Sequence, residues 1–270
     1  MPVIVGTSGW QYRDWRGCLY PAGVPQRSWL EYYAGHFAAV ENNGAFYRLP
    51  PRGAFSAWRD RTPAGFVMAV KASRYLTHIR RLREPAEPVR RLLDAAAGLG
   101  DRLGPILLQL PPNFRADPLA LDGCLAEFAR QAKVAGLPAG LVPVRVAVEL
   151  RHESWWTGPT REVLTRHQAA LCWADRLGRP LSPLWRTADW GYLRLHEGGA
   201  RSWPRYGQAA LRRWVTEAAE AFADKADFFA FFNNDQNGAA VRDAAAFTAI
   251  ARRAGRTVAD PPPGGDPQAR

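Results

Sequence analysis

The sequence predicts a single (β/α)8 barrel of the TIM type. Eight short apolar runs of strand length alternate along the chain with segments in which apolar residues recur every three or four positions. The 270 residues, 47% of them hydrophobic, suit the size and the core of one such barrel. We therefore expect one domain over residues 1–258. Because the last residues are rich in proline and glycine, we expect a disordered tail over 259–270.

Each expected strand is an apolar run bounded by polar or turn residues. The runs cover residues 3–8, 38–43, 66–73, 105–110, 144–151, 169–175, 191–196 and 227–234. Helices between them are indicated by apolar spacing, as in Trp29, Tyr33 and Phe37 after the first run. Similar spacing follows the third, fourth, seventh and eighth runs. The sixth unit is the exception, since residues 176–188 hold two prolines and little periodicity, and we expect a loop or a short distorted helix there.

Composition narrows the class of protein. The formal net charge is +11, almost all of the positive charge being arginine. This favours an anionic partner, either a small molecule or a nucleic acid, although much of the arginine falls on polar helix positions that face solvent. The sequence shows no secretory signal and no membrane-spanning run, so we expect a cytoplasmic protein without a membrane partner. Cys18, Cys124 and Cys172 form no metal or disulfide pattern, and the sequence leaves the cofactor unknown.

The alternation of side chains along a strand predicts which residues point into the barrel, because the outward residues must meet apolar helices. In the fifth run Val146, Val148 and Leu150 face outward, which turns Glu149 and Arg151 inward.

The same rule turns further polar side chains inward at the carboxyl ends of the strands, where barrel enzymes hold their active sites. They are Glu41, Asn43, Lys71, Gln109, Tyr192, Arg194 and His196, with Asp175, Asn233, Asn234 and Asp235 nearby. Buried charges need partners, water or a ligand. We expect part of this set to form an ion-pair ladder, with Glu41 and Glu149 against Lys71 and Arg194. Asn42 falls on the helix-facing side, for which the pattern gives no reason.

Seven motifs resemble those of one known family. They are GTSGWQYRDWRGCLYP, YYAGHFAAVENNGAFYRLP, VKASRYLTHIRRL, GPILLQLPPNF, VAVELRHESWW, YLRLH and FFNNDQNGAA. Together they are similar to the successive motifs of the YecE-like family, domain of unknown function 72, over residues 6–246. The resemblance implies a TIM-type barrel with its site at the strand ends, and it implies no reaction. This chain has Ala45 where the family usually has a hydroxyl residue, and Asn42 where it usually has an aliphatic one.

We hypothesise an enzyme that acts on an anionic, phosphorylated or carboxylated, sugar-like small molecule by general acid/base chemistry, as a hydrolase, isomerase or lyase. The catalytic candidates are Glu41, Glu149, Lys71 and His196, since two glutamates in a partly dry mouth can acquire different pKa values. Arginine and lysine suit anion binding. The candidate ligand-binding residues are Trp10, Tyr12, Asn43, Tyr47, Arg48, His78, Gln109, Arg151, His152, Trp155, Arg194, Asn233, Asn234 and Asp235.

Several alternatives stay open. The protein could bind or process nucleic acid, or serve as a non-enzymatic ligand-binding scaffold. Lys71 as a Schiff-base nucleophile is disfavoured by the glutamates around it. A metal site is disfavoured by the cations in the same mouth, and we predict none; its ligands would be Glu41, Glu149, Asp175, His196 and Asp235. The tryptophans of the loops, Trp10, Trp15, Trp155 and Trp156, either stack on a ligand or form a hydrophobic lid.

The segment after the third run, residues 75–82, is longer than a turn requires. We predict that His78 leans back over the mouth near Lys71, and that Arg80 and Arg81 divide between the mouth and solvent.

Overall fold

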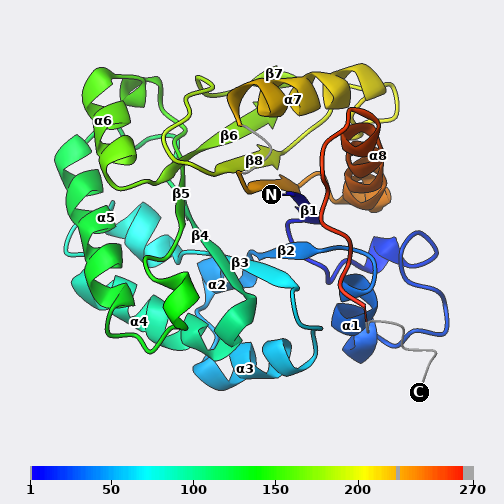
Figure 1. Ribbon diagram of the computed structural model, residues 1–270, viewed down its shortest axis with the longest axis horizontal. Coiled ribbons are helices and arrows are strands. Elements are labelled where there is room, and N and C mark those ends of the chain that lie inside the picture. Colours follow the sequence, from blue (N-terminus) through cyan, green and yellow to red (C-terminus); the bar gives the residue numbers. More distant parts are fainter. Residues whose placement is uncertain (1, 223–225, 264–270) are drawn as a thin grey trace.

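Eight parallel strands close into a barrel in the computed structural model, which describes residues 2–222 and 226–263 (Figure 1). The strands are β1 (Val3–Thr7), β2 (Ala39–Asn42), β3 (Val67–Lys71), β4 (Leu103–Gln109), β5 (Val146–Glu149), β6 (Ala170–Arg176), β8 (Gly191–Leu195) and β9 (Phe228–Phe232). They pair in this order, and β9 pairs back with β1. The predicted TIM-type barrel is confirmed, with each strand starting and ending within a few residues of its predicted bounds.

Helices surround the strands on the outside (Figure 1). They are α1 (Trp29–Ala34), α2 (Gly44–Tyr47), α3 (Arg52–Asp60), α4 (Ala86–Ala96), α5 (Pro118–Ala132), α6 (Gly158–Arg166), α7 (Gln208–Ala221) and α8 (Ala239–Arg253). Residues 177–190, which are all described, contain no helix; the short strand β7 (Arg179–Pro180) instead turns back antiparallel to the end of β6. The predicted irregular sixth unit is confirmed.

Two apolar layers enclose the strands. The layer between strands and helices includes Val146, Val148, Leu193 and Leu195. The barrel interior holds a separate cluster, which consists largely of small or aromatic side chains: Ile4, Ala39, Ala69, Leu107, Ala147, Ala170, Cys172, Tyr192, Phe229 and Phe231. Strand alternation therefore carries the inward set on to Glu41, Lys71, Gln109, Glu149 and Arg194 at the carboxyl ends, as predicted.

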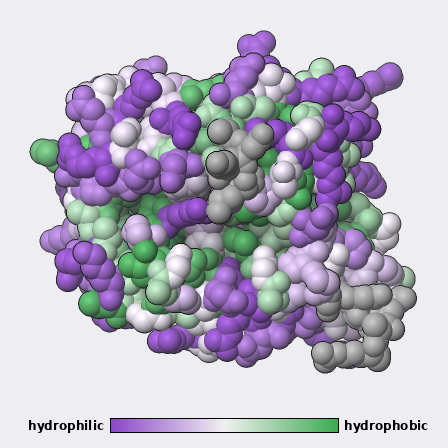
Figure 2. Space-filling model, in the orientation of Figure 1, coloured by the Kyte–Doolittle hydropathy of each residue, from purple (hydrophilic) through white to green (hydrophobic). Residues whose placement is uncertain are grey.

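The molecular surface carries polar residues in many places. Figure 2 shows hydrophilic residues in several groups over the visible face, with apolar residues between them. This distribution agrees with arginines spread along solvated helix positions. No helix within the described residues is both long and apolar enough to cross a membrane.

The structure explains the outward-facing Asn42. Its side-chain Oδ1 accepts the N–H of Ala45 at 3.1 Å, and its Nδ2 lies 3.9 Å from the Met68 sulfur. Early N–H groups of a helix lack backbone partners, and side-chain oxygens commonly satisfy them. Asn42 therefore supports the start of α2, the turn that follows β2 at the barrel mouth.

The barrel contacts continue past the predicted domain boundary. Ala259, the first residue predicted for the disordered tail, donates its N–H to Val3 O at 2.9 Å, and Val258 pairs with Val3 as an isolated bridge. Backbone pairing beside β1 therefore reaches Ala259. The part of the predicted tail over 264–270 lies outside the described residues.

Candidate active site

One guanidinium joins two buried carboxylates in the barrel mouth. Arg194 comes from β8, Glu41 from β2 and Glu149 from β5, and each side chain is at most 1% exposed. Arg194 Nη2 donates to Glu41 Oε1 at 2.7 Å, and Nη1 donates to Glu149 Oε2 at 2.5 Å. Buried charges persist when they are paired and hydrogen-bonded. We call this group the ion triad, Glu41–Arg194–Glu149.

Neutral donors complete the environment of Glu41. Ser8 Oγ donates to Glu41 Oε1 at 2.8 Å, and the Tyr192 hydroxyl donates to Oε2 at 2.6 Å. Both carboxylate oxygens therefore accept hydrogen bonds from groups fixed on β8 or next to β1, which holds the side chain in one position.

Two arginines and one histidine surround Glu149. Arg151 Nε donates to Glu149 Oε1 at 2.7 Å, and His196 Nε2 lies 3.2 Å from the same oxygen. His196 Nδ1 lies 3.2 Å from Asn233 Nδ2, which can only donate, so the histidine carries its proton on Nε2. Burial alone would raise the pKa of Glu149, but Arg194, His196 and Arg151 outweigh it and hold the pKa well below its usual range. Glu149 therefore remains a carboxylate at neutral pH.

The predicted ion-pair ladder forms with different cations. Sequence analysis paired Glu41 and Glu149 with Lys71 and Arg194, whereas Arg194 bridges both carboxylates and Arg151 supplies the additional charge. The terminal nitrogens of Arg194 are thereby engaged with the glutamates. Its buried Nε has no hydrogen-bond partner among the described residues.

Lys71 lies at the end of β3 outside this network. Its side chain is nearly buried, at 9% exposure, and it forms no hydrogen bond or ion pair with the described residues. Its Nζ lies 4.2 Å from the centre of the Phe46 ring, and the His78 ring packs edge-on against the same phenylalanine at 4.9 Å. Burial, followed by the charge of Arg194, lowers the pKa of Lys71 to about 8, although Glu41 and Glu149 act in the opposite direction. An amine with this pKa changes charge near neutrality.

His78 lies near Lys71, since both side chains contact the Phe46 ring. Its Nδ1 lies 2.9 Å from Thr77 Oγ1, and burial followed by the charge of Lys71 lowers its pKa. Beside it, Arg80 pairs with exposed Glu84 at 2.5 Å, while the Arg81 guanidinium lies 5.8 Å from the centre of the Phe114 ring.

Two further polar side chains at the mouth keep unused hydrogen-bonding groups. Arg151 uses Nε for Glu149, and its side chain is 33% exposed. Gln109, from the end of β4, is 6% exposed and makes no hydrogen bond with the described residues. Register places Gln109 opposite Glu149 on the neighbouring strand, so an amide and a guanidinium edge lie beside the triad.

A second group of polar side chains lies over β1, β2 and β9. The Tyr12 hydroxyl donates to Ser8 O at 2.6 Å, and Asn43 Nδ2 donates to the same carbonyl at 3.4 Å. Asn43 Oδ1 and Asp235 Oδ1 are buried and have no partner among the described residues. Burial is the main reason why the pKa of Asp235 is raised to about 6. A buried acceptor without a donor is unfavourable for stability and is typical of functional sites.

Asp235→Asn is expected to stabilise the protein by about 1–2 kcal/mol above pH 6, after allowance for partial exposure. Because the folded-state pKa of about 6 lies above the ordinary value of about 3.9, the wild type loses stability as the pH rises between these values. The variant lacks this loss, so the gain should vanish below about pH 4. Urea unfolding at both pH values measures it. Asp189→Asn is the control, because Asp189 is exposed and forms no ion pair within the described residues. A destabilised Asp235→Asn protein at neutral pH would contradict the prediction.

Comparison with known proteins gives the family. The family model described as "Protein of unknown function DUF72" matches residues 4–267. The chain belongs to the DUF72 family. A solved DUF72 structure from Thermotoga maritima is 26% identical, covers 93% of this chain and 100% of its own, and has a TM-score of 0.73. Another from Enterococcus faecalis is 18% identical, covers 97% and 98%, and has a TM-score of 0.74; at that identity it shows the fold alone. No curated protein matches the chain.

Two tryptophans predicted to contact a ligand are core residues in this DUF72 protein. Trp10 is 6% exposed and packs edge-on against Trp58 at 5.6 Å. Trp155 is fully buried, and its indole N–H donates to Phe114 O at 2.8 Å. Trp15 is also fully buried. These three rings are buried and pack the loops against the barrel. They therefore offer no exposed surface on which a nucleic-acid base could stack.

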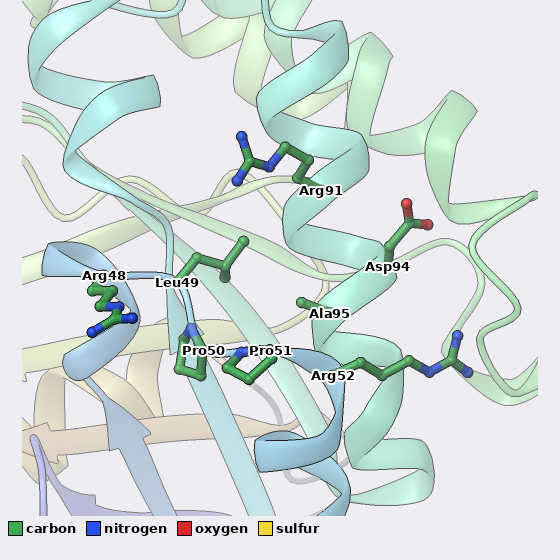
Figure 3. Close-up of a pocket in the computed structure, with 8 residues that line it drawn as sticks. All are labelled: Arg48, Leu49, Pro50, Pro51, Arg52, Arg91, Asp94 and Ala95. Atoms are coloured by element: carbon green, nitrogen blue, oxygen red, sulfur yellow. The ribbon is translucent and has the colours of Figure 1, made fainter.

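Tyr47 and Arg48 extend away from the strand ends. Tyr47 is 76% exposed. Arg48 lines a cavity of about 730 Å³ outside the barrel, between the end of α2 and the α3 and α4 helices (Figure 3). Arg52 from α3 lines the same cavity, together with Arg91 and Asp94 from α4. The two residues predicted for the mouth thus lie at its outer margin, because α2 carries the chain outward after Asn43.

Asn234 and Asp175 face the helices. Asn234 Nδ2 donates to Pro204 O and to Asp243 Oδ2 on α8. Asp175 accepts from the Tyr206 hydroxyl at 2.6 Å and from the Trp214 indole at 2.9 Å. Asp175 lies on the outward side of β6, and Asn234 follows the end of β9; through these bonds both hold the loop after β8. His152 caps the turn that follows it, since its Nδ1 accepts the Ser154 N–H at 3.1 Å.

The sequence pattern gave Ser8 and Phe46 no role in the site, and it turned Tyr192 inward without a partner. Ser8 and Tyr192 bind Glu41, and Phe46 covers Lys71. Strand parity had turned Tyr192 inward, but only the structure shows its hydroxyl reaching a carboxylate. Within the described residues, no group of three or more histidine, cysteine, aspartate or glutamate side chains is arranged to hold a metal ion.

Proposed function

We propose that this DUF72 protein binds an anionic small molecule at the carboxyl ends of its strands and transfers protons to or from it. The observation that carries the proposal is Lys71, a nearly buried cation without an ion-pair partner among the described residues. Burying an uncompensated charge is unfavourable, and a negatively charged ligand relieves that cost.

The charge balance of the mouth supports an anion. Within the hydrogen-bonded network, the carboxylates of Glu41 and Glu149 are matched by the guanidinium groups of Arg194 and Arg151. Lys71 is additional to this balanced set. A phosphate or carboxylate between Lys71 and the open edge of Arg151 accepts charge-assisted hydrogen bonds from both.

The pKa directions favour particular residues for proton transfer. Glu149 is held well below its usual pKa, so it is a poor proton donor at neutral pH. Lys71 and Asp235, with pKa values of about 8 and about 6, exchange protons readily near neutrality. We assign proton transfer to Lys71 and Asp235. Glu41 and Glu149 stay ionised in our proposal and contribute the electrostatic potential around these two groups. His196, hydrogen-bonded to Glu149, remains a candidate for relaying a proton.

A sugar-like ligand suits the remaining polar groups. Gln109 has an unused amide, and Asn43 and Asp235 each have a buried oxygen without a donor. Ligand hydroxyl groups both donate and accept, so they complement these side chains.

Lys71→Met is expected to weaken anion binding at least about tenfold, because a charge-assisted hydrogen bond contributes roughly 1.5–3 kcal/mol. The measurement is calorimetric titration with inorganic phosphate, sugar phosphates and hydroxy acids. Lys133→Met removes the same charge from the exposed carboxyl end of α5, and its affinities should equal those of the wild type. Equal binding by both variants, or no binding of any of these anions by the wild type, contradicts the proposal. Binding without turnover in a metabolite screen would favour the ligand-binding scaffold over an enzyme.

A further inference from the structure

We propose that Lys71 reacts covalently with its ligand, forming an imine with an aldehyde or ketone that also carries a carboxylate or phosphate. This inference rests on the proposed anionic ligand of the mouth and adds the carbonyl group to it.

The position of Lys71 suits a nucleophile. Its amine ends a rigid strand, lies against the Phe46 ring and makes no hydrogen bond or ion pair within the described part of the chain. A lysine with a carboxylate partner is held as an ammonium ion, whose nitrogen has no free electron pair. A desolvated lysine next to other cations is instead activated, because its neutral form becomes accessible.

The two glutamates near Lys71 do not remove this activation. Glu41 receives hydrogen bonds from Ser8, Tyr192 and Arg194, and Glu149 receives them from Arg194, Arg151 and His196. Both carboxylates are therefore already paired with Arg194 or Arg151, and neither forms an ion pair with Lys71.

The charged groups acting on the amine come from several elements. Arg194 on β8 and Arg151 after β5 disfavour the ammonium form, and Glu41 on β2 and Glu149 on β5 favour it. His78, after β3, is affected by the charge of Lys71 in turn. Burial and the arginines prevail, and the pKa of Lys71 is lowered to about 8, so roughly one amine in ten is neutral at pH 7.

Polar groups next to Lys71 can position an anionic carbonyl compound for attack. The exposed edge of Arg151 and the free amide of Gln109 hold the carboxylate or phosphate, which leaves the carbonyl carbon facing Lys71. The neutral amine nitrogen attacks that carbon, and the carbonyl π bond breaks to give a carbinolamine. Both amine hydrogens then leave with the carbonyl oxygen as water. The product is a C=N bond, which takes up one proton from solvent, and no oxidant or reductant is needed.

Reductive trapping tests the inference. The folded wild-type protein is treated near pH 7 with glyoxylate, a small aldehyde with a carboxylate, and cyanoborohydride, which reduces an imine to a stable secondary amine. Peptide mass analysis then locates the carboxymethyl group. The chain has three lysines, of which Lys71 and Lys133 lie in the described residues, so Lys133 is an internal control in the same sample. Lys71 should react at least about tenfold faster than Lys133, and acetaldehyde, which lacks the carboxylate, should show a smaller preference for Lys71.

The outcomes separate this inference from the proposed function. An unmodified Lys71, or one modified no faster than Lys133, overturns the imine even where phosphate binding depends on Lys71. Selective modification of Lys71 by acetaldehyde and glyoxylate alike overturns the anionic class of carbonyl ligand. Lys71→Met supplies the blank: its glyoxylate adducts should fall only on the other amines.

Discussion

Arg194→Met is expected to lower the free energy of unfolding by about 3–5 kcal/mol, because it leaves two buried carboxylates without their shared cation. Glu41 and Glu149 are both fully buried, and each contributes an oxygen to the Arg194 guanidinium. Methionine fills part of the volume but supplies no charge. Urea unfolding followed by tryptophan fluorescence at neutral pH measures the loss.

Two further variants isolate the cause. Arg90→Met breaks the exposed ion pair with Asp94 on α4 and should cost less than about 1 kcal/mol. Combining Arg194→Met with Glu41→Gln and Glu149→Gln removes the unpaired charges and should recover part of the stability, which keeps the test available if the single variant does not fold. A single variant as stable as the wild type would mean that water or other cations compensate the carboxylates.

The alternation of side chains was enough to predict that Glu41, Glu149 and Arg194 point into the barrel. In β5 and β8 the outward positions are apolar without exception, so Glu149 and Arg194 had one orientation available. Alternation still holds for Arg151 and His196, one or two residues past their strands, but it does not extend to residues several positions further along the chain. Arg48 shows this, since α2 carries it to an outer cavity.

Partner choice could not be predicted from the same pattern. Lys71 and Arg194 both point inward at strand ends, and the sequence pattern placed both in one predicted ion-pair ladder with Glu41 and Glu149. Arg194 bridges two glutamates because the planar guanidinium offers two separated donors, whereas the single ammonium of Lys71 lies over Phe46. Which cation reaches which carboxylate depends on strand register and on side-chain conformation, and neither follows from residue type alone.

The aromatic loops were ambiguous for a different reason. A tryptophan offers a large apolar surface and one polar N–H, so it suits both a ligand platform and a buried plug. Trp155 is a buried plug because Phe114 supplies both an edge-on ring contact at 5.4 Å and a carbonyl acceptor. The contact joins the loops after β4 and β5, a pairing that becomes visible only when the barrel closes.

Trp155→Ala is therefore expected to destabilise the protein by about 3–5 kcal/mol, the usual cost of removing a fully buried tryptophan. The side chain has no exposed surface, so alanine leaves a cavity and an unpaired carbonyl at Phe114. Trp203→Ala is the matched control, because Trp203 is 54% exposed and binds only the Glu197 carboxylate at the rim, and it should cost less than about 1 kcal/mol. Thermal and urea unfolding of the two variants give the comparison.

Trp155→Phe retains most of the packing and loses only the indole hydrogen bond, so it should cost about 1 kcal/mol and remain folded if the alanine variant does not. Wild-type stability of Trp155→Ala together with loss of anion binding would instead place this ring against the ligand, as the sequence had indicated.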